Sequence, residues 1–177
     1  KCSKTMYDDI EDHGGRAVMW KTGHSLIKEK MKAENADLAG EMSGHMFFAD
    51  RYFGFDDAVY ASCRLLEILS VTGKTIDQLL EGVPETVTTP EIRVDCADEV
   101  KFEVVERARQ ILEKQYEVID IDGVRIVFDD GWGLVRASNT QPALVMRFES
   151  LFRPRLAEIQ EIVENAVAAA KAEMQKS

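Results

Sequence analysis

The first half of the chain alternates short apolar runs with segments in which apolar residues recur at helical spacing. The runs predict strands and cover residues 17–20, 36–42 and 45–49. Residues 56–69 form the longest helical pattern, with an apolar inner face that includes Val59, Leu65 and Leu66. A shorter helix is predicted to begin with Ser25 as its N-cap. Strands that alternate with helices indicate an α/β layer.

The second half has several strands in succession, with a helix near each end. The predicted strands cover residues 92–94, 118–121, 124–128, 133–137 and 143–149. Asp98 is the predicted N-cap of the first helix, and Pro154 is predicted to open the last one. Asp122 and Gly123 are predicted to form a two-residue hairpin turn. This order is typical of an α+β domain with an antiparallel sheet and two flanking helices.

A segment rich in glycine, proline and threonine separates the two halves. It lies between residues 73 and 91, where the regular patterns on either side stop. We place the domain boundary there, near Val87. The sequence therefore predicts an α/β unit over residues 1–86 and an α+β domain over residues 87–177.

Charge and hydropathy narrow the classes of partner. The 177 residues include 32 acidic and 22 basic side chains, and the net charge of −10 is opposite to that of a general nucleic-acid binder. No apolar run approaches the roughly 20 residues that span a bilayer, and the first residues lack the apolar core of a signal peptide. The sequence thus predicts a cytoplasmic protein that binds neither nucleic acid nor membrane.

The spacing of cysteines and histidines gives no sign of a disulfide framework or a metal site. These residues are Cys2, Cys63, Cys96, His13, His24 and His45. An odd number of cysteines without a CxxC pair indicates reduced thiols. The histidines have neither HExxH spacing nor neighbouring cysteines, so we expect no metal ligands in this chain.

The segment from Arg136 to Pro142 carries side chains that suit a phosphate. Arg136 offers a planar fork of donors that matches two phosphate oxygens. Ser138 and Thr140 add hydroxyl groups, and Asn139 adds an amide. An ordinary polar turn that stops at Pro142 explains the same residues, and it is the commoner case when the segment is taken alone.

Two segments of the first half have side chains that suit a sugar or an anion. Glu41 and Ser43 supply a carboxylate and a hydroxyl for neighbouring sugar hydroxyls, although a tight loop between strands is the commoner explanation of such residues. Residues 21–25 join a predicted strand to a predicted helix, where unpaired N–H groups favour anions. This second segment contains Thr22, Gly23 and His24.

Together, these segments resemble the phosphomannomutase/phosphoglucomutase branch of the α-D-phosphohexomutases. Residues 53–57 and 131–135 are also similar to the family, and the likeness extends over about residues 1–149. Met42 and Asn139 favour this branch over the similar phosphoglucosamine mutases, which usually carry Gln and Gly in these places. Family members have four domains. The resemblance therefore implies the later part of the third, α/β domain, whose layer is incomplete here, followed by the whole fourth, α+β domain.

The resemblance also implies roles for individual residues. Glu41 and Ser43 belong to the loop that selects the sugar, and His45 lies near the reaction centre as a candidate acid or base. A second segment of the family that contacts the ligand is matched by Thr22, Gly23 and His24. The loop that holds the phosphate not being transferred comprises Arg136, Ser138, Asn139 and Thr140.

Enzymes of this family interconvert the 1- and 6-phosphates of mannose or glucose, through a phosphoserine and a hexose 1,6-bisphosphate intermediate. The family's phosphoserine loop and its Asp-rich loop for Mg²⁺ do not occur in this sequence. The resemblance thus implies a C-terminal fragment that binds hexose phosphate but is inactive alone, with Mg²⁺ bound by the missing part. The alternative function is that of a non-catalytic module that binds a sugar phosphate or a protein partner.

A cut through the third domain would leave its sheet with an open edge. Unpaired strand groups and uncovered apolar side chains promote pairing with a second copy or aggregation. We therefore expect self-association through the truncated sheet. The residues most exposed by the cut are predicted to be Val18, Met19, Trp20 and Leu38.

Overall fold

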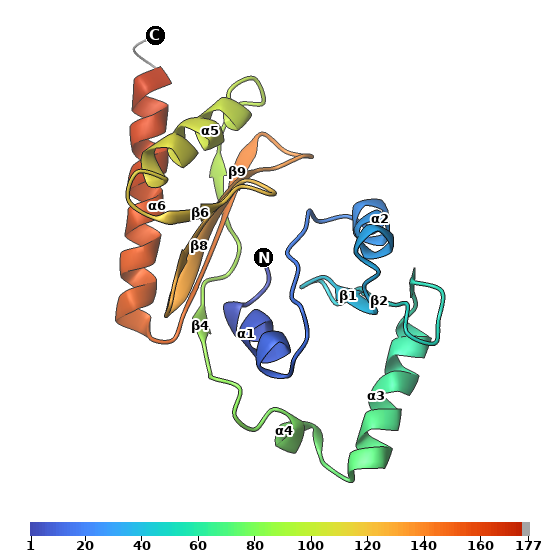
Figure 1. Cartoon of the computed structure of the whole chain (residues 1–177). Helices are drawn as coiled ribbons and strands as arrows, with labels where there is room; N and C mark the ends of the chain where they lie inside the picture. The colour runs from blue at the N-terminus through green and yellow to red at the C-terminus, as the bar shows by residue number, and fades with distance from the viewer. Residues whose placement is uncertain (175–177) are drawn as a thin grey trace. The chain divides into compact units, whose positions relative to one another are not determined.

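The computed structural model describes residues 1–174 and divides the chain into two compact units (Figure 1). The N-terminal unit comprises Cys2 and Lys4–Val83, and the C-terminal unit comprises Lys1, Ser3 and the chain from Pro84 onward. The sequence prediction puts the boundary near Val87. No helix of the described residues has the length and apolar character needed to cross a membrane.

The N-terminal unit is a small antiparallel sheet with helices around it. Its elements are α1 (Lys4–Asp12), α2 (His24–Glu34), β1 (Leu38–Gly40), β2 (Met46–Phe48), β3 (Phe55–Asp56), α3 (Ala58–Thr72) and α4 (Ile76–Leu79). The strands lie in the order β1-β2-β3, and Phe47 pairs with Asp56 across the β2–β3 ladder. The buried cluster of this unit contains Ile27, Met31 and Phe47, with Ala36 and Ala39 half-buried against it.

Two sequence predictions for the start of this unit are wrong. Residues 17–20 form no strand, because a strand needs a neighbour to pair its N–H and C=O groups and none lies beside this run. Ser25 does not cap α2, because the helix begins one residue earlier, at His24, and Gly23 occupies the N-cap. Of the four side chains predicted to be exposed to solvent, Val18, Trp20 and Leu38 are exposed, whereas Met19 is half-buried.

Helix α3 forms where the sequence predicts a helix, but its predicted inner face is not covered. Asp57 caps the helix by accepting a hydrogen bond from the Tyr60 N–H at 2.9 Å, and Gly73 ends it in the left-handed region at φ 65°. No residue of α3 is buried, and Val59 and Leu66 are 76% and 63% exposed. The capping residues at its two ends therefore set the limits of α3, without support from a buried core.

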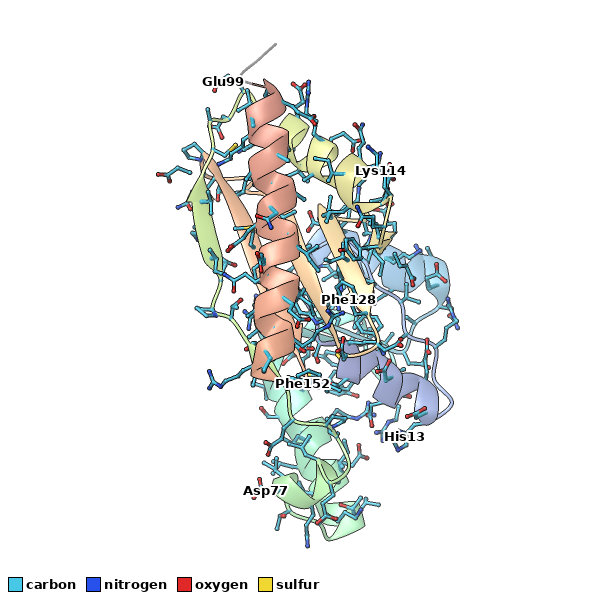
Figure 2. The ribbon with its side chains drawn as sticks, turned by 90° about the vertical axis from the view of Figure 1, so that its left-hand side faces the viewer. His13, Asp77, Glu99, Lys114, Phe128 and Phe152 are labelled. Atoms are coloured by element: carbon cyan, nitrogen blue, oxygen red, sulfur yellow. The ribbon has the colours of Figure 1, made fainter. Side chains whose placement is uncertain are left out.

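The C-terminal unit is one antiparallel sheet with two helices on it. Its elements are β4 (Val87–Thr88), β5 (Ile92–Asp95), α5 (Lys101–Leu112), β6 (Glu117–Ile119), β7 (Val124–Phe128), β8 (Gly131–Ala137), β9 (Ala143–Ser150) and α6 (Arg153–Met174). The strands lie in the order β4-β9-β8-β7-β6, and β5 also pairs with β9. Figure 2 shows α6 along one face of this sheet, beginning just after Phe152. The predicted antiparallel α+β architecture is confirmed.

Alternate residues of the central strands form the core beneath the two helices. The strand residues that face α5 and α6 in this core are Val124, Ile126, Val135, Ala137, Leu144, Met146 and Phe148. Gly133 lets α6 approach β8, because a Cβ there would lie 2.9 Å from Ile159 Cγ2 and 3.0 Å from Val163 Cγ2. The absence of a side chain at Gly133 therefore sets how closely the helix and the sheet pack.

Two local predictions for this unit are corrected. Asp98 does not cap α5, since Val100 occupies the N-cap without a side-chain bond and Asp98 instead accepts a hydrogen bond from Lys101 Nζ at 2.6 Å. The β6–β7 turn is wider than two residues, because the β6–β7 ladder ends where Ile119 pairs with Arg125. Gly123 still takes the positive φ, 89°, that a turn glycine supplies.

Candidate functional site

The loop between β1 and β2 is a tight turn closed by its own backbone. The Glu41 N–H donates to the His45 carbonyl, and the Gly44 N–H donates to the Glu41 carbonyl, each at 2.9 Å. The Glu41 carboxylate accepts hydrogen bonds from Ser43 Oγ at 3.2 Å and from the Gly23 N–H at 3.1 Å. Glu41 therefore joins the loop to the start of α2, and it brings three predicted site residues together. Thr22, beside Gly23, is exposed.

Two histidines and a carboxylate meet beside this loop. His24 is the first residue of α2, His45 immediately precedes β2, and Asp56 ends β3. Asp56 Oδ2 lies 2.7 Å from His45 Nδ1 and 3.6 Å from His24 Nε2, and the two rings are 4.4 Å apart at 73°. Burial would raise the pKa of Asp56, but hydrogen bonds from His45 and from the Met46 N–H hold this pKa below its ordinary value.

Asp56 is a residue of this cluster that sequence reasoning missed. It lies in a segment that carries the family resemblance, but its place beside His45 depends on the pairing of β2 with β3. That pairing is a property of the folded sheet and not of the local pattern. The cluster also unites three residues whose spacing in the sequence gives no sign of a common site.

The described residues do not fit Mg²⁺. Mg²⁺ prefers an octahedral set of oxygen ligands, mainly carboxylates and water. Among residues 1–174, the one group of three or more metal-capable side chains is His24, His45 and Asp56, and two of its three donors are nitrogen atoms. We therefore derive no catalytic step through Mg²⁺ from these residues.

A cavity in the C-terminal unit contains the predicted phosphate-binding arginine. Its volume is about 220 Å³, and its lining residues are Phe102, Val105, Glu106, Arg109, Asp120, Asp122, Gly123, Val124, Arg136, Ala137 and Asn139. Arg136 Nη1 lies 3.5 Å from Asp122 Oδ2, which among residues 1–174 is the acidic group paired with it. Within the described part of the chain, Arg136 Nε is buried and has no hydrogen-bond partner. A buried guanidinium donor without an acceptor is unusual and favours an incoming anion.

The segment after Arg136 combines the two interpretations that its sequence allows. Ser138 is buried, and its Oγ accepts hydrogen bonds from the backbone N–H groups of Thr140 at 3.4 Å and Gln141 at 3.2 Å. This contact is that of an ordinary polar turn. Asn139 and Thr140 are exposed, and Asn139 lines the cavity with Arg136. Ser138 thus shapes the turn, while Arg136 and Asn139 line the cavity beside it.

Three residues at this cavity were not singled out as site residues from the sequence. Arg109 lines the cavity from α5, and its hydrogen bond to Glu106 raises its pKa above the usual value. Its acidic neighbours at helical spacing make it look like part of a solvated helix face. Asp122 and Gly123 belong to the β6–β7 turn, and a Cβ on Gly123 would lie 2.4 Å from Arg136 Cβ. The turn therefore packs directly against Arg136 near its Cα and Cβ atoms.

Family models match almost the whole chain. The model described as phosphoglucomutase/phosphomannomutase, alpha/beta/alpha domain III, matches residues 1–87. The model described as phosphoglucomutase/phosphomannomutase, C-terminal domain, matches residues 91–166. The two matches follow the order in which the two units occur along the chain.

Individual relatives agree with these models. The phosphomannomutase/phosphoglucomutase of Pseudomonas putida is 46% identical to this chain, and the match covers 99% of this chain and 38% of the relative. The phosphomannomutase/phosphoglucomutase of Pseudomonas aeruginosa is 45% identical, and the match covers 96% of this chain and 37% of the relative. A solved phosphoglucomutase/phosphomannomutase family protein from Burkholderia thailandensis is 42% identical, with a TM-score of 0.84 over 96% of this chain and 36% of its own. The N-acetylphosphoglucosamine mutase of Aspergillus fumigatus, at 15% identity and a TM-score of 0.64 over 97% of this chain and 37% of its own, shares the fold. The chain thus spans little more than a third of the length of these relatives.

Proposed function

Because the chain belongs to the phosphoglucomutase/phosphomannomutase family, we propose that the whole protein interconverts the 1- and 6-phosphates of mannose or glucose. In this proposal the reaction proceeds through a phosphoserine and a hexose 1,6-bisphosphate, with Mg²⁺ as the metal. The nucleophile and the Mg²⁺ ligands would belong to the part of the protein outside this chain. The chain itself would supply contacts to the sugar and to the phosphate that is not being transferred.

The observation that carries the proposal is the burial and the hydrogen bonding of the Arg136 side chain. Its side chain is 18% exposed, it lines a cavity, and its Nε donor is buried without an acceptor in the described residues. A hexose phosphate would place two oxygens on the guanidinium fork, with Asn139 beside it. Asp122 is the competing anion, and at 3.5 Å it is far enough from Nη1 to be replaced by a phosphate oxygen.

The loop around Glu41 would form hydrogen bonds with the hydroxyl groups of the sugar. Each oxygen of the Glu41 carboxylate accepts one hydrogen bond from the residues that the structure describes and has a second lone pair for a sugar hydroxyl. His45 would act as an acid or base, because Asp56 Oδ2 holds its Nδ1 at 2.7 Å and its other ring nitrogen is then oriented by that contact. Thr22, Gly23, His24 and Ser43 would complete the sugar contacts.

The proposal is tested first at Arg136, in the full-length protein. Arg136→Lys keeps the charge but loses the two-pronged contact, so the affinity for glucose 1-phosphate should fall about ten- to a hundredfold by calorimetric titration. Arg107→Lys, on α5 and ion-paired with Glu103, is the matched control and should bind as the parent protein does. An unchanged affinity in Arg136→Lys would mean that this loop does not hold phosphate.

The sugar contact is tested separately at Glu41. Glu41→Gln replaces one acceptor oxygen with a donor amide, so hexose phosphate should bind more weakly while inorganic phosphate binds as before. Glu29→Gln, on the exposed part of α2, is the control. An equal loss for both ligands would show that Glu41 serves only to hold the loop to Gly23.

We also propose that isolated copies of this chain associate through the N-terminal unit. β1 is an edge strand, and Leu38 on it is 51% exposed. Further exposed apolar side chains lie on and near α3, with Phe53 and Val71 at 78% and 81%. An open strand edge beside uncovered apolar surface favours pairing with a second copy.

A further inference from the structure

We propose that His24, His45 and Asp56 form a binding site for a borderline divalent metal ion, with Zn²⁺ as the preferred occupant. The three donor atoms lie within 4.8 Å of one another. This site is distinct from the Mg²⁺ of the proposed reaction, and its existence does not depend on mutase activity. The structure assigns it from the geometry and the chemistry of the donors.

The spacing of the donors is close to that of a coordination sphere. An ion with bonds of about 2.0–2.2 Å holds its ligands roughly 3–3.5 Å apart. Asp56 Oδ2 is 2.7 Å from His45 Nδ1 and 3.6 Å from His24 Nε2. Each donor therefore has to move by less than about 1 Å to receive the ion. Entry of the ion would displace the proton that His45 Nδ1 now shares with Asp56.

The type of donor selects the class of metal. Two imidazole nitrogens and one carboxylate oxygen suit Zn²⁺ and its transition-metal neighbours, whereas Mg²⁺ and Ca²⁺ prefer oxygen alone. Three protein ligands also leave a fourth position for water or another ligand. His24 and His45 are partly open to solvent, with 47% and 43% of their side chains exposed, so an ion can reach them.

Neighbouring groups hold the ligands in place, as they do around established metal sites. The Met46 N–H donates to Asp56 Oδ1 at 3.2 Å, which fixes the carboxylate with its other oxygen towards the histidines. Phe47, which is fully buried, meets the ring of His24 edge-on at 5.2 Å. The β2–β3 pairing of Phe47 with Asp56 keeps these supports together. The three ligands are thus set on a paired sheet and a helix start rather than on a free loop.

The test is calorimetric titration of ZnCl₂ alone into the 177-residue chain. Cys2→Ser and Cys63→Ser form the background, because these two thiols are not buried and would compete for zinc. We expect one Zn²⁺ per chain. His24→Ala and His45→Ala should each weaken binding at least about tenfold, since even residues that only support a ligand contribute that much. His13→Ala removes the third histidine, outside the cluster, and should leave the affinity unchanged.

The carboxylate and the choice of metal are tested in the same way. Asp56→Asn should weaken Zn²⁺ binding, whereas Asp37→Asn, an exposed residue outside the cluster, should not. MgCl₂ should give no heat of binding that depends on His24 or His45. The inference is overturned if the parent chain binds no Zn²⁺, or if binding survives both histidine substitutions.

A measurement without substitutions in the cluster guards against misfolded variants. In the NMR spectrum of the chain that keeps His24, His45 and Asp56, added Zn²⁺ should shift the imidazole signals of His24 and His45. The imidazole signals of His13 should stay in place. Shifts of all three rings by the same amount, or of His13 alone, would reject the site whatever the variants show.

Discussion

The two units bury their apolar side chains to very different extents. In the C-terminal unit, two helices cover one face of a long antiparallel sheet, and large residues such as Phe148 and Ile159 are fully buried. In the N-terminal unit, the buried cluster is limited to Ile27, Met31 and Phe47, while Phe53, 78% exposed, is one of many open apolar side chains. Burial of apolar area is the main source of stability, so the C-terminal unit should be much the more stable.

The comparison shows which structural features need a core and which do not. Helix α3 has a side-chain cap at Asp57 and a left-handed glycine at its end, and it forms with no buried residue. The run at residues 17–20 has the composition of a strand but lacks a neighbour, and no strand forms. Helix ends are therefore encoded by a few adjacent residues, whereas a strand requires a partner from elsewhere in the chain.

The largest effect should come from opening the C-terminal core. Phe148→Ala removes a fully buried ring, which costs about 3–5 kcal/mol in the free energy of unfolding. Phe53→Ala removes an equally large ring that is 78% exposed, and its effect should stay within about 0.5 kcal/mol. Urea unfolding of Phe148→Ala is followed by the fluorescence of Trp132, which is buried in the C-terminal unit, in a Trp20→Phe background. Unfolding of Phe53→Ala is followed by the fluorescence of Trp20, which lies in the N-terminal unit, in a Trp132→Phe background. Equal costs for the two substitutions would remove the contrast between the units.

Hydrogen exchange compares the two sheets directly. The amides of β8 lie at the centre of a large covered sheet, whereas those of β2 lie at the centre of a small one. In a strictly monomeric sample, β8 amides should exchange on the order of a hundredfold more slowly than β2 amides with similar intrinsic rates. Equal protection would mean that the N-terminal unit has a stability that its small buried cluster does not explain.

The sequence was sufficient to predict those strands and helices whose hydrophobic pattern lies within the element itself. Helix α6 and the strands β5 to β9 have clear helical spacing or alternation and form near the predicted residues, whereas β4, in the predicted boundary segment, was not predicted. Arg136 could be singled out because its chemistry and its neighbours in the turn are adjacent in the sequence. The predicted burial of the α3 face was wrong, since burial depends on what packs against a helix and not on the helix itself.

The missed site residues share a physical reason. Asp56 reaches His45 through strand pairing, and Arg109 reaches the cavity because α5 packs on the sheet that carries Arg136. Both contacts join residues that are distant in the sequence. The short-range signals around Asp56 and Arg109 instead favour a strand end and a charged helix surface. Such residues become visible only when the topology is known.

Self-association should respond to the edge of the smaller sheet. Leu38→Lys places a charge on β1, so the dissociation constant between copies of the chain should rise about tenfold in sedimentation experiments. Val71→Lys adds the same charge on α3, at an 81% exposed position in the uncovered apolar surface, and it separates the contribution of that surface from that of the strand edge. If Val71→Lys has the larger effect, the copies associate through the uncovered apolar surface and not through strand pairing.

The smallest expected effect concerns the cap of α3, which stabilises a helix that has no core. Hydrogen bonds from the Tyr52 hydroxyl and from the Tyr60 N–H hold the pKa of Asp57 below its ordinary value. The ionised carboxylate therefore stabilises the folded helix above the ordinary pKa of about 4, and this contribution is lost as the pH falls through the lower folded pKa.

Acidification from about pH 6 to about pH 2.5 should therefore reduce the helical ¹³Cα shifts of Ala58 and Val59, with the helix–coil equilibrium changing on the order of fivefold. Asp57→Asn retains an acceptor oxygen for the Tyr60 N–H but has no proton to gain, so its shifts should change much less over the same range. If the parent chain and the Asp57→Asn variant lose helical ¹³Cα shift equally on acidification, the first turn of α3 does not depend on the charge of Asp57.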